Sequence, residues 1–196
     1  MRIVLATTNE NKLREVREIL GSDYEVLSPA DVGVNVDIEE DGETFEENAI
    51  KKAEHVMRLC GEITLADDSG LEIDYLNGEP GVHSSRFMGE DTPYSVKNHA
   101  ILEKLKDARG SQRSARFVCA VAAALPGKYT IIAQETLEGE IATVPRGENG
   151  FGYDPIVSVP KYKMTTAELP PDRKNKISHR GKAFRAVAER LARVEW

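Results

Sequence analysis

The chain has 196 residues, a formal net charge of −7 and only two cysteines. Its length suits one well-buried domain, and its 40% hydrophobic and 30% charged residues are typical of a globular protein in water. The acid excess argues against a general affinity for nucleic acid, and no stretch approaches the length of a membrane span.

We therefore expect a single domain spanning residues 1–196, located in the cytoplasm. No secretion signal is expected, because polar residues follow the short apolar run after Met1 too soon. Cys60 and Cys119 both lie in apolar-periodic segments, which favours buried free thiols over a disulfide or a metal site.

Hydrophobic periodicity and turn residues predict an alternation of strands and helices. The predicted strands are 2–7, 24–27, 63–66, 71–75, 115–125, 129–134 and 136–144. The predicted helices are 11–20, 44–60, 92–106 and 181–194. Gly21 lies where a helix C-cap would, and Thr44 with Glu47 fits a capping box. The strands outnumber a pure βαβ repeat, so we expect a mixed α/β sheet surrounded by helices.

An acidic pair, Asp67 and Asp68, lies between the two strands predicted at 63–66 and 71–75. Adjacent carboxylates repel each other, so such a pair is favoured where a divalent cation or a proton transfer uses the charge. The alternative is an acidic turn ended by Gly70.

A polar segment from Thr7 to Lys12 joins the first predicted strand to the first predicted helix. The free amides and the dipole of a helix start favour an anion, and the lysine adds a cation, so the segment resembles a phosphate site without a glycine-rich loop. The alternative is that Thr8 or Asn9 only caps the helix.

The acidic stretch 37–43 precedes the second predicted helix, where Asn48 and Lys52 share one face. Such a stretch is typical of a solvated loop. Lys52 lies beside an apolar stripe, however, and a phosphate between it and a metal held by Asp67 and Asp68 would explain this position.

Two further segments contain residue types that suit a flat, anionic ligand. The glycine-rich segment 147–155 includes Phe151 and Tyr153, which offer ring faces for stacking, or else fill the core from a mobile loop. The basic run 173–180 ends at a predicted helix start, where the dipole disfavours cations, so it either faces an anion or forms a solvated surface.

Taken together, these segments resemble the inosine triphosphatase family, the XTP/dITP pyrophosphatases. The matching motifs are T-x-N-x-x-K at 7–12, E-N-A-x-x-K-A at 47–53, A-D-D-S-G-L at 66–71, F-G-Y-D-P at 151–155 and S-H-R-G at 178–181. They occur in order over almost the whole chain, and no motif position departs from the pattern.

The resemblance implies a mixed α/β fold in which an elongated central sheet with flanking helices forms two lobes around an active-site cleft, and it implies a homodimer. It also implies Mg²⁺-dependent hydrolysis of a purine nucleoside triphosphate, with ITP, dITP and XTP favoured over ATP and GTP, to the monophosphate and pyrophosphate. Neither a nucleic acid nor a membrane is expected as a partner.

Residue roles follow from the same resemblance. Asp68 is the general base and a metal ligand, and Asp67 with either Glu39 or Glu40 completes the magnesium site; spacing does not choose between the two glutamates. The residues expected to hold the triphosphate are Thr7, Thr8, Asn9, Glu10, Asn11, Lys12, Lys52 and Ser69, and those expected at the base are Phe151, Gly152, Tyr153, Asp154, Lys174, His179 and Arg180.

Two other interpretations compete with this one. A pyrimidine-directed pyrophosphatase of the Maf-like type is disfavoured, because its first loop would be arginine-rich. A non-enzymatic nucleotide sensor would tolerate loss of the acidic pair, which is intact here.

Overall fold

The computed structural model describes residues 1–35 and 38–195, and it shows a mixed α/β fold with one seven-stranded sheet. The strands are β1 (Arg2–Leu5), β2 (Glu25–Leu27), β3 (Thr64–Ile73), β4 (Ser114–Ala124), β5 (Thr130–Ile141), β6 (Val157–Val159) and β7 (Met164–Thr165). The helices are α1 (Glu10–Leu20), α2 (Phe45–Cys60), α3 (Tyr94–Lys104), α4 (Pro171–Ile177) and α5 (His179–Leu191).

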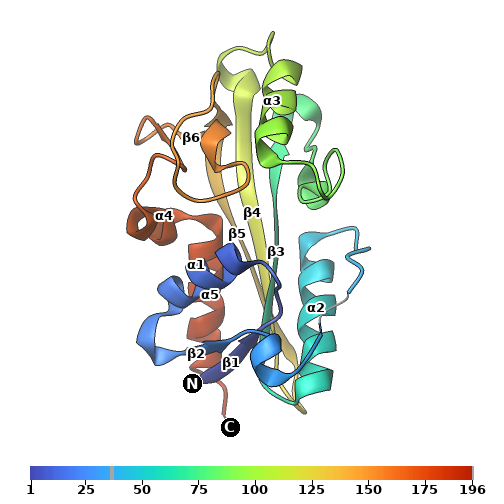
Figure 1. Cartoon of the computed structure of the whole chain (residues 1–196). Coiled ribbons are helices and arrows are strands. Elements are labelled where there is room, and N and C mark those ends of the chain that lie inside the picture. The colour runs from blue at the N-terminus through green and yellow to red at the C-terminus, as the bar shows by residue number, and fades with distance from the viewer. Residues whose placement is uncertain (36–37, 196) are drawn as a thin grey trace.

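The strand order in the sheet is β2-β1-β3-β4-β5-β6-β7. Strand β1 runs parallel to β2 and β3, whereas the later neighbours are antiparallel. The three long strands β3, β4 and β5 run along most of the molecule, with α3 and β6 at the upper end and α1, α2, α5 and both termini at the lower end (Figure 1). The predicted mixed, elongated sheet with flanking helices is therefore confirmed.

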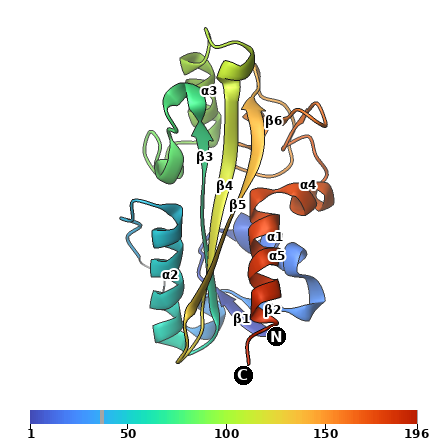
Figure 2. The same cartoon turned by 180° about the vertical axis from the view of Figure 1, so that it is seen from behind.

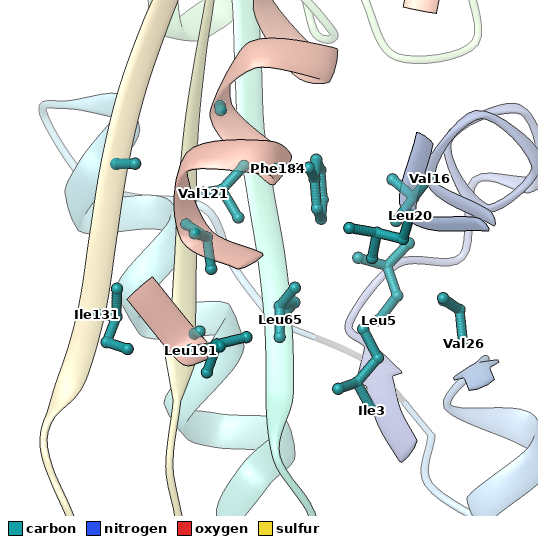
Figure 3. Packing of buried hydrophobic residues seen from close by; sticks show 14 of the residues in the cluster. Ile3, Leu5, Val16, Leu20, Val26, Leu65, Val121, Ile131, Phe184 and Leu191 are labelled. Atoms are coloured by element: carbon teal, nitrogen blue, oxygen red, sulfur yellow. The ribbon is translucent and has the colours of Figure 1, made fainter. Parts of the chain in front are cut away.

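Helices cover both faces of the lower sheet: α2 lies on one side and α5 with α1 on the other (Figures 1 and 2). Helix α1 is amphipathic and buries Leu13, Val16 and Leu20, which pack in one cluster with Leu5 of β1 and Phe184 of α5 (Figure 3). Because these segments come from the two ends of the chain, the lower core joins its beginning to its end.

Helix α2 begins as predicted, with a capping box formed by Thr44 and Glu47. It buries Phe45, Ala49 and Ala53 against the sheet, which fixes the helical face that also carries Asn48 and Lys52. The first residue of the acidic stretch, Asp37, lies outside the described residues.

The largest departure from the predicted elements is strand β3, which runs without a break through the acidic pair, where two separate strands at 63–66 and 71–75 were predicted on either side of the pair. Strand β4 pairs with β3 along its whole length. Position 70 requires glycine, because a Cβ there would lie only 2.3 Å from the carbonyl oxygen of Gly81. Likewise, one strand, β5, replaces the two expected at 129–134 and 136–144. Helix α4 was not predicted.

Both cysteines are free, as predicted; Cys119 is buried and Cys60 half-buried. Among the described residues, no helix combines the length and apolarity needed to cross a membrane.

Candidate active site

A cavity of about 640 Å³ opens where the end of β1, the start of α1, helix α2, the middle of β3 and the start of α5 meet the loops 84–86 and 151–154. Sixteen of the predicted site residues line it: Thr7, Thr8, Asn9, Lys12, Glu39, Glu40, Lys52, Asp68, Ser69, Phe151, Gly152, Tyr153, Asp154, Lys174, His179 and Arg180. Glu10, Asn11 and Asp67 are not part of this lining; Asn11 faces a smaller neighbouring cavity.

The acidic pair is divided between the two faces of the sheet, because successive side chains of a strand point to opposite sides. Asp68 faces α2 and accepts a hydrogen bond of 3.0 Å from the Asn48 side chain. Asp67 faces α1 and α5, where its Oδ2 lies 3.1 Å from both Lys12 Nζ and Arg180 Nη2.

Asp67 is fully enclosed, with a side-chain exposure of 0%. Burial alone would raise the pKa of this carboxyl, but the charges of Lys12 and Arg180 outweigh it and hold the pKa far below its usual range. The expectation that Asp67 completes a metal site beside Asp68 does not fit this geometry, because its carboxylate is fully buried, does not line the cavity and is already paired with Lys12 and Arg180.

Asp68 has the more open and less neutralised environment. Burial raises the pKa of its carboxyl above the ordinary value, the ammonium of Lys52 opposes that shift, and the charge of Glu40 adds to it. Lys52 Nζ lies 3.8 Å from Asp68 Oδ1. A carboxylate with a raised pKa, fixed by an amide and open to a cavity, is suited to accept a proton.

The glutamates expected at the metal differ in their surroundings. Glu40 pairs with Lys52, and its backbone oxygen accepts a hydrogen bond of 2.7 Å from Arg86. Glu39 is exposed, and within the described part of the chain its carboxylate forms no ion pair. Of these two glutamates, Glu39 is therefore the one whose carboxylate is not already engaged by a cation of the described chain.

The start of α1 is capped by Asn9, whose side chain accepts hydrogen bonds from the amides of Asn11 and Lys12. These two amides are therefore engaged by Asn9, which caps the helix and also lines the cavity. Thr7, Thr8 and the ammonium of Lys12 still line the cavity at this end. An anion at this end of the cavity would therefore contact these three side chains and not the backbone amides of Asn11 and Lys12.

The loop 151–154 presents the ring of Phe151 to the cavity, and two cations lie under it, Lys174 Nζ at 5.1 Å and the Arg180 guanidinium at 5.4 Å from the ring centroid. Asp154 fixes the loop by accepting hydrogen bonds from the Phe151 amide and from Lys174 Nζ. Its role here is to shape the loop.

Tyr153 also holds the loop 151–154 in place. Its hydroxyl donates a hydrogen bond of 2.6 Å to the Ser84 carbonyl oxygen, and its ring packs edge-on against Tyr94 of α3. The loop 151–154 is thereby attached to the upper part of the molecule.

In the basic run 173–180, Lys174 and Arg180 are buried and paired, whereas Arg173 and Lys176 are exposed, so the solvated-surface alternative holds for part of the run only. Glu15 of α1 lies 2.7 Å from both Lys174 Nζ and Arg180 Nη1. The charges of Arg180 and Lys174 outweigh the effect of burial and lower the pKa of Glu15.

His179 differs from its two basic neighbours because its ring stacks on Phe117, with centroids 4.8 Å apart. Burial and the charge of Arg180 lower the pKa of its imidazole well below the usual value. Its Nδ1 is buried without a hydrogen-bond partner among the described residues. A neutral imidazole therefore lines the cavity beside the ring of Phe117.

The profile of the Ham1 family matches residues 3–190. This chain belongs to the Ham1 family. The resemblance inferred from the motifs is thereby confirmed.

Relatives of this Ham1 protein match it over nearly its whole length. A dITP/XTP pyrophosphatase of Bacillus subtilis (strain 168) is 47% identical over 189 residues, covering 96% of each chain, and one of Clostridium perfringens is 43% identical over 197 residues, covering 97% of each. The solved HAM1 protein of Coxiella burnetii superposes with a TM-score of 0.88 at 44% identity, covering 99% of this chain and 100% of the other. The Ham1 protein of Staphylococcus aureus gives 0.86 at 40% identity, covering 98% of each chain.

Several cavity residues of this Ham1 protein were not predicted from its sequence: Ser84, Ser85, Arg86, Glu90, Tyr94 and Phe117 line the site, and Glu15 and Asn48 support it. Only Asn48 had a usable signal, since it lies one helical turn before Lys52. Arg86 is notable because no carboxylate of the described chain pairs with it, whereas Lys12, Lys52, Lys174 and Arg180 all have acidic partners.

Proposed function

We propose that this Ham1 protein hydrolyses dITP, ITP and XTP to the nucleoside monophosphate and pyrophosphate. The observation that carries the proposal is the position of Asp68, a fixed carboxylate of raised pKa in the same cavity as Lys12, Lys52 and the ring of Phe151. The relatives whose names contain this activity match nearly the full length of the chain.

In this proposal, Asp68 accepts the proton of the attacking water. The oxygen of this water forms a new bond to the α-phosphorus, the bond from the α-phosphorus to the oxygen that bridges to the β-phosphate breaks, and pyrophosphate leaves with the electron pair of the broken bond. Such reactions are accelerated mainly by positioning and by charge neutralisation. Lys12, Lys52 and the unpaired Arg86 supply positive charge at the phosphate end of the cavity.

The donor set fits Mg²⁺, although the described residues contain no ready group of three or more His, Cys, Asp or Glu side chains that could hold a metal ion. Magnesium is usually bound by one or two carboxylates together with water and substrate phosphates. Asp68 and Glu39 line the cavity and supply such oxygens, and Glu40 is the alternative to Glu39. When bound, the ion would neutralise phosphate charge.

The base would lie at the opposite end of the cavity. Phe151 offers a stacking face that every purine shares. The neutral imidazole of His179 lines the cavity, and we assign it to reading the base edge. Lys174 and Arg180 are held by Glu15, so we assign them to the support of Phe151 and of the pocket floor. We further propose that the chain forms a homodimer, which light scattering of the purified protein tests.

The decisive experiment is a screen of dITP, ITP, XTP, GTP, ATP and dUTP with Mg²⁺, in which pyrophosphate and orthophosphate are measured separately. Pyrophosphate from the first three substrates is the expected product. Release of orthophosphate, or equal use of ATP, would contradict the proposal. Glu39→Gln and Glu40→Gln, compared at increasing Mg²⁺, identify the metal ligand: Glu39→Gln should need the higher concentration.

A further inference from the structure

We propose that Asn48 is a positioning residue that joins the metal-binding loop to the general base. This inference rests on the proposed function and extends it to a residue that does not line the cavity. Asn48 is 1% exposed, on the face of α2 that packs on the sheet. Its side chain is the only direct hydrogen-bonded link, among the described residues, between Asp68 and the segment 38–42.

Both ends of the Asn48 amide are engaged. Its Oδ1 accepts a hydrogen bond of 2.8 Å from the Gly42 amide, and its Nδ2 donates one of 3.0 Å to Asp68 Oδ2. The orientation is forced, because a backbone N–H can only donate and so must face the amide oxygen. The nitrogen is thereby directed at the carboxylate.

Gly42 is the residue that allows this contact. A Cβ at position 42 would lie 2.6 Å from Asn48 Oδ1 and 3.1 Å from its Cγ. A side chain there would push the amide away from the loop or from Asp68. The hydrogen bond between Gly42 and Asn48 therefore depends on both residues: glycine at position 42 and an amide side chain at position 48.

As a consequence, the two carboxylate oxygens of Asp68 have different contacts. Asn48 holds Oδ2, whereas Oδ1 accepts a hydrogen bond of 3.1 Å from the Ser69 amide and lies 3.8 Å from Lys52 Nζ. Through its hydrogen bond to the Gly42 amide, the same side chain also positions the loop that carries Glu39 and Glu40 relative to Asp68. Loss of a partner that orients a metal ligand typically lowers affinity or activity about 10–100-fold.

Three variants separate the two hydrogen bonds. Asn48→Asp keeps an acceptor for Gly42 and removes the donor to Asp68, Asn48→Ala removes both bonds, and Gly42→Ala keeps both groups but displaces them. The matched control is Glu54→Ala, because Glu54 lies on the same helix and accepts a hydrogen bond of 2.8 Å from Thr130, away from the cavity.

Two readouts are needed: kcat and KM for dITP at saturating Mg²⁺, and the affinity for Mn²⁺ alone, measured by calorimetry without nucleotide. Asn48→Ala and Asn48→Asp should lower kcat by about tenfold or more with KM changed less than about threefold, and Asn48→Ala should weaken Mn²⁺ binding by about tenfold. Gly42→Ala should lower kcat in the same direction, and Glu54→Ala should retain wild-type values in both assays.

The inference is overturned if folded Asn48→Ala keeps kcat and Mn²⁺ affinity within about twofold of wild type, or if Glu54→Ala loses as much as Asn48→Ala. If the wild-type protein hydrolyses none of the nucleotides, the proposed function fails. The Mn²⁺ titration then decides the role of Asn48 by itself, and unchanged affinity in Asn48→Ala overturns it.

Discussion

Replacing Asp67 by asparagine tests whether this carboxylate is a structural counter-ion and not a metal ligand. In the wild-type protein its Oδ2 contacts Lys12, Arg180 and the hydroxyl of Ser69 at 3.1 Å each. Asp67→Asn keeps the volume but leaves Lys12 without a carboxylate and Arg180 with Glu15 alone. Removing one partner of a buried ion pair destabilises a protein by about 3–5 kcal/mol.

We expect the lower end of that range, about 3 kcal/mol, because the new amide can still hydrogen-bond and Glu15 still faces Arg180. For a chain of this length, that corresponds to a fall in Tm of about 6–12 °C. The free energy of unfolding is measured in urea by circular dichroism, and Tm by calorimetry. The control is Asp74→Asn, which weakens an exposed contact with Arg116 and should change stability by less than about 1 kcal/mol.

The difference in unfolding free energy between wild type and Asp67→Asn should depend on pH in one direction. The pKa of Asp67 is depressed in the folded protein, so its contribution to stability is complete above the unfolded-state pKa of about 3.9 and is lost as the pH falls below that value. The gap between wild type and Asp67→Asn should be constant from about pH 6 to pH 8 and shrink in acid. Equal unfolding free energies at pH 7.5 would refute the assignment.

Three further predictions concern the reaction. Asp68→Asn should lower pyrophosphate release by about 10²-fold or more while circular dichroism is unchanged, because an amide cannot accept the proton; near-normal turnover would remove Asp68 from the mechanism. Phe151→Ala should lower kcat/KM for ITP, XTP and GTP by similar factors, since stacking does not distinguish purines, and a loss confined to one base would contradict this role. His179→Phe keeps the stack on Phe117 but removes the nitrogens, so the ratio of kcat/KM for ITP to that for ATP should fall by about tenfold; an unchanged ratio assigns base reading elsewhere.

The elements that sequence periodicity predicted correctly are those fixed by local interactions. Helix α2 is one example, because its capping box and apolar stripe lie within its own residues. Strand β3 is the opposite case. Its acidic pair was predicted to separate two strands, but the strand continues because cations from distant segments neutralise Asp67 and an amide from α2 holds Asp68.

The candidate site shows the same division between local and distant information. The motifs identified most of the residues that line the cavity, because the residue types themselves suit phosphate and purine chemistry. They did not identify Glu15 or Arg86, since each acts through a partner far away in the chain. The roles expected for Asp67, Lys174 and Arg180 also needed the structure, because only it shows that their charges are already paired.

The ion pairs of Arg180 have a consequence for how the protein is made. Arg180 contacts Glu15 and Asp67, which precede it by 165 and 113 residues. During synthesis on the ribosome, both carboxylates are therefore made long before the cation that joins them, and helix α5 completes the lower core only after residues 179–191 have been made. A nascent chain that stops before α5 has Asp67 without Arg180, so burial of this face of the sheet waits for α5. A chain truncated before α5 consequently lacks the complete site.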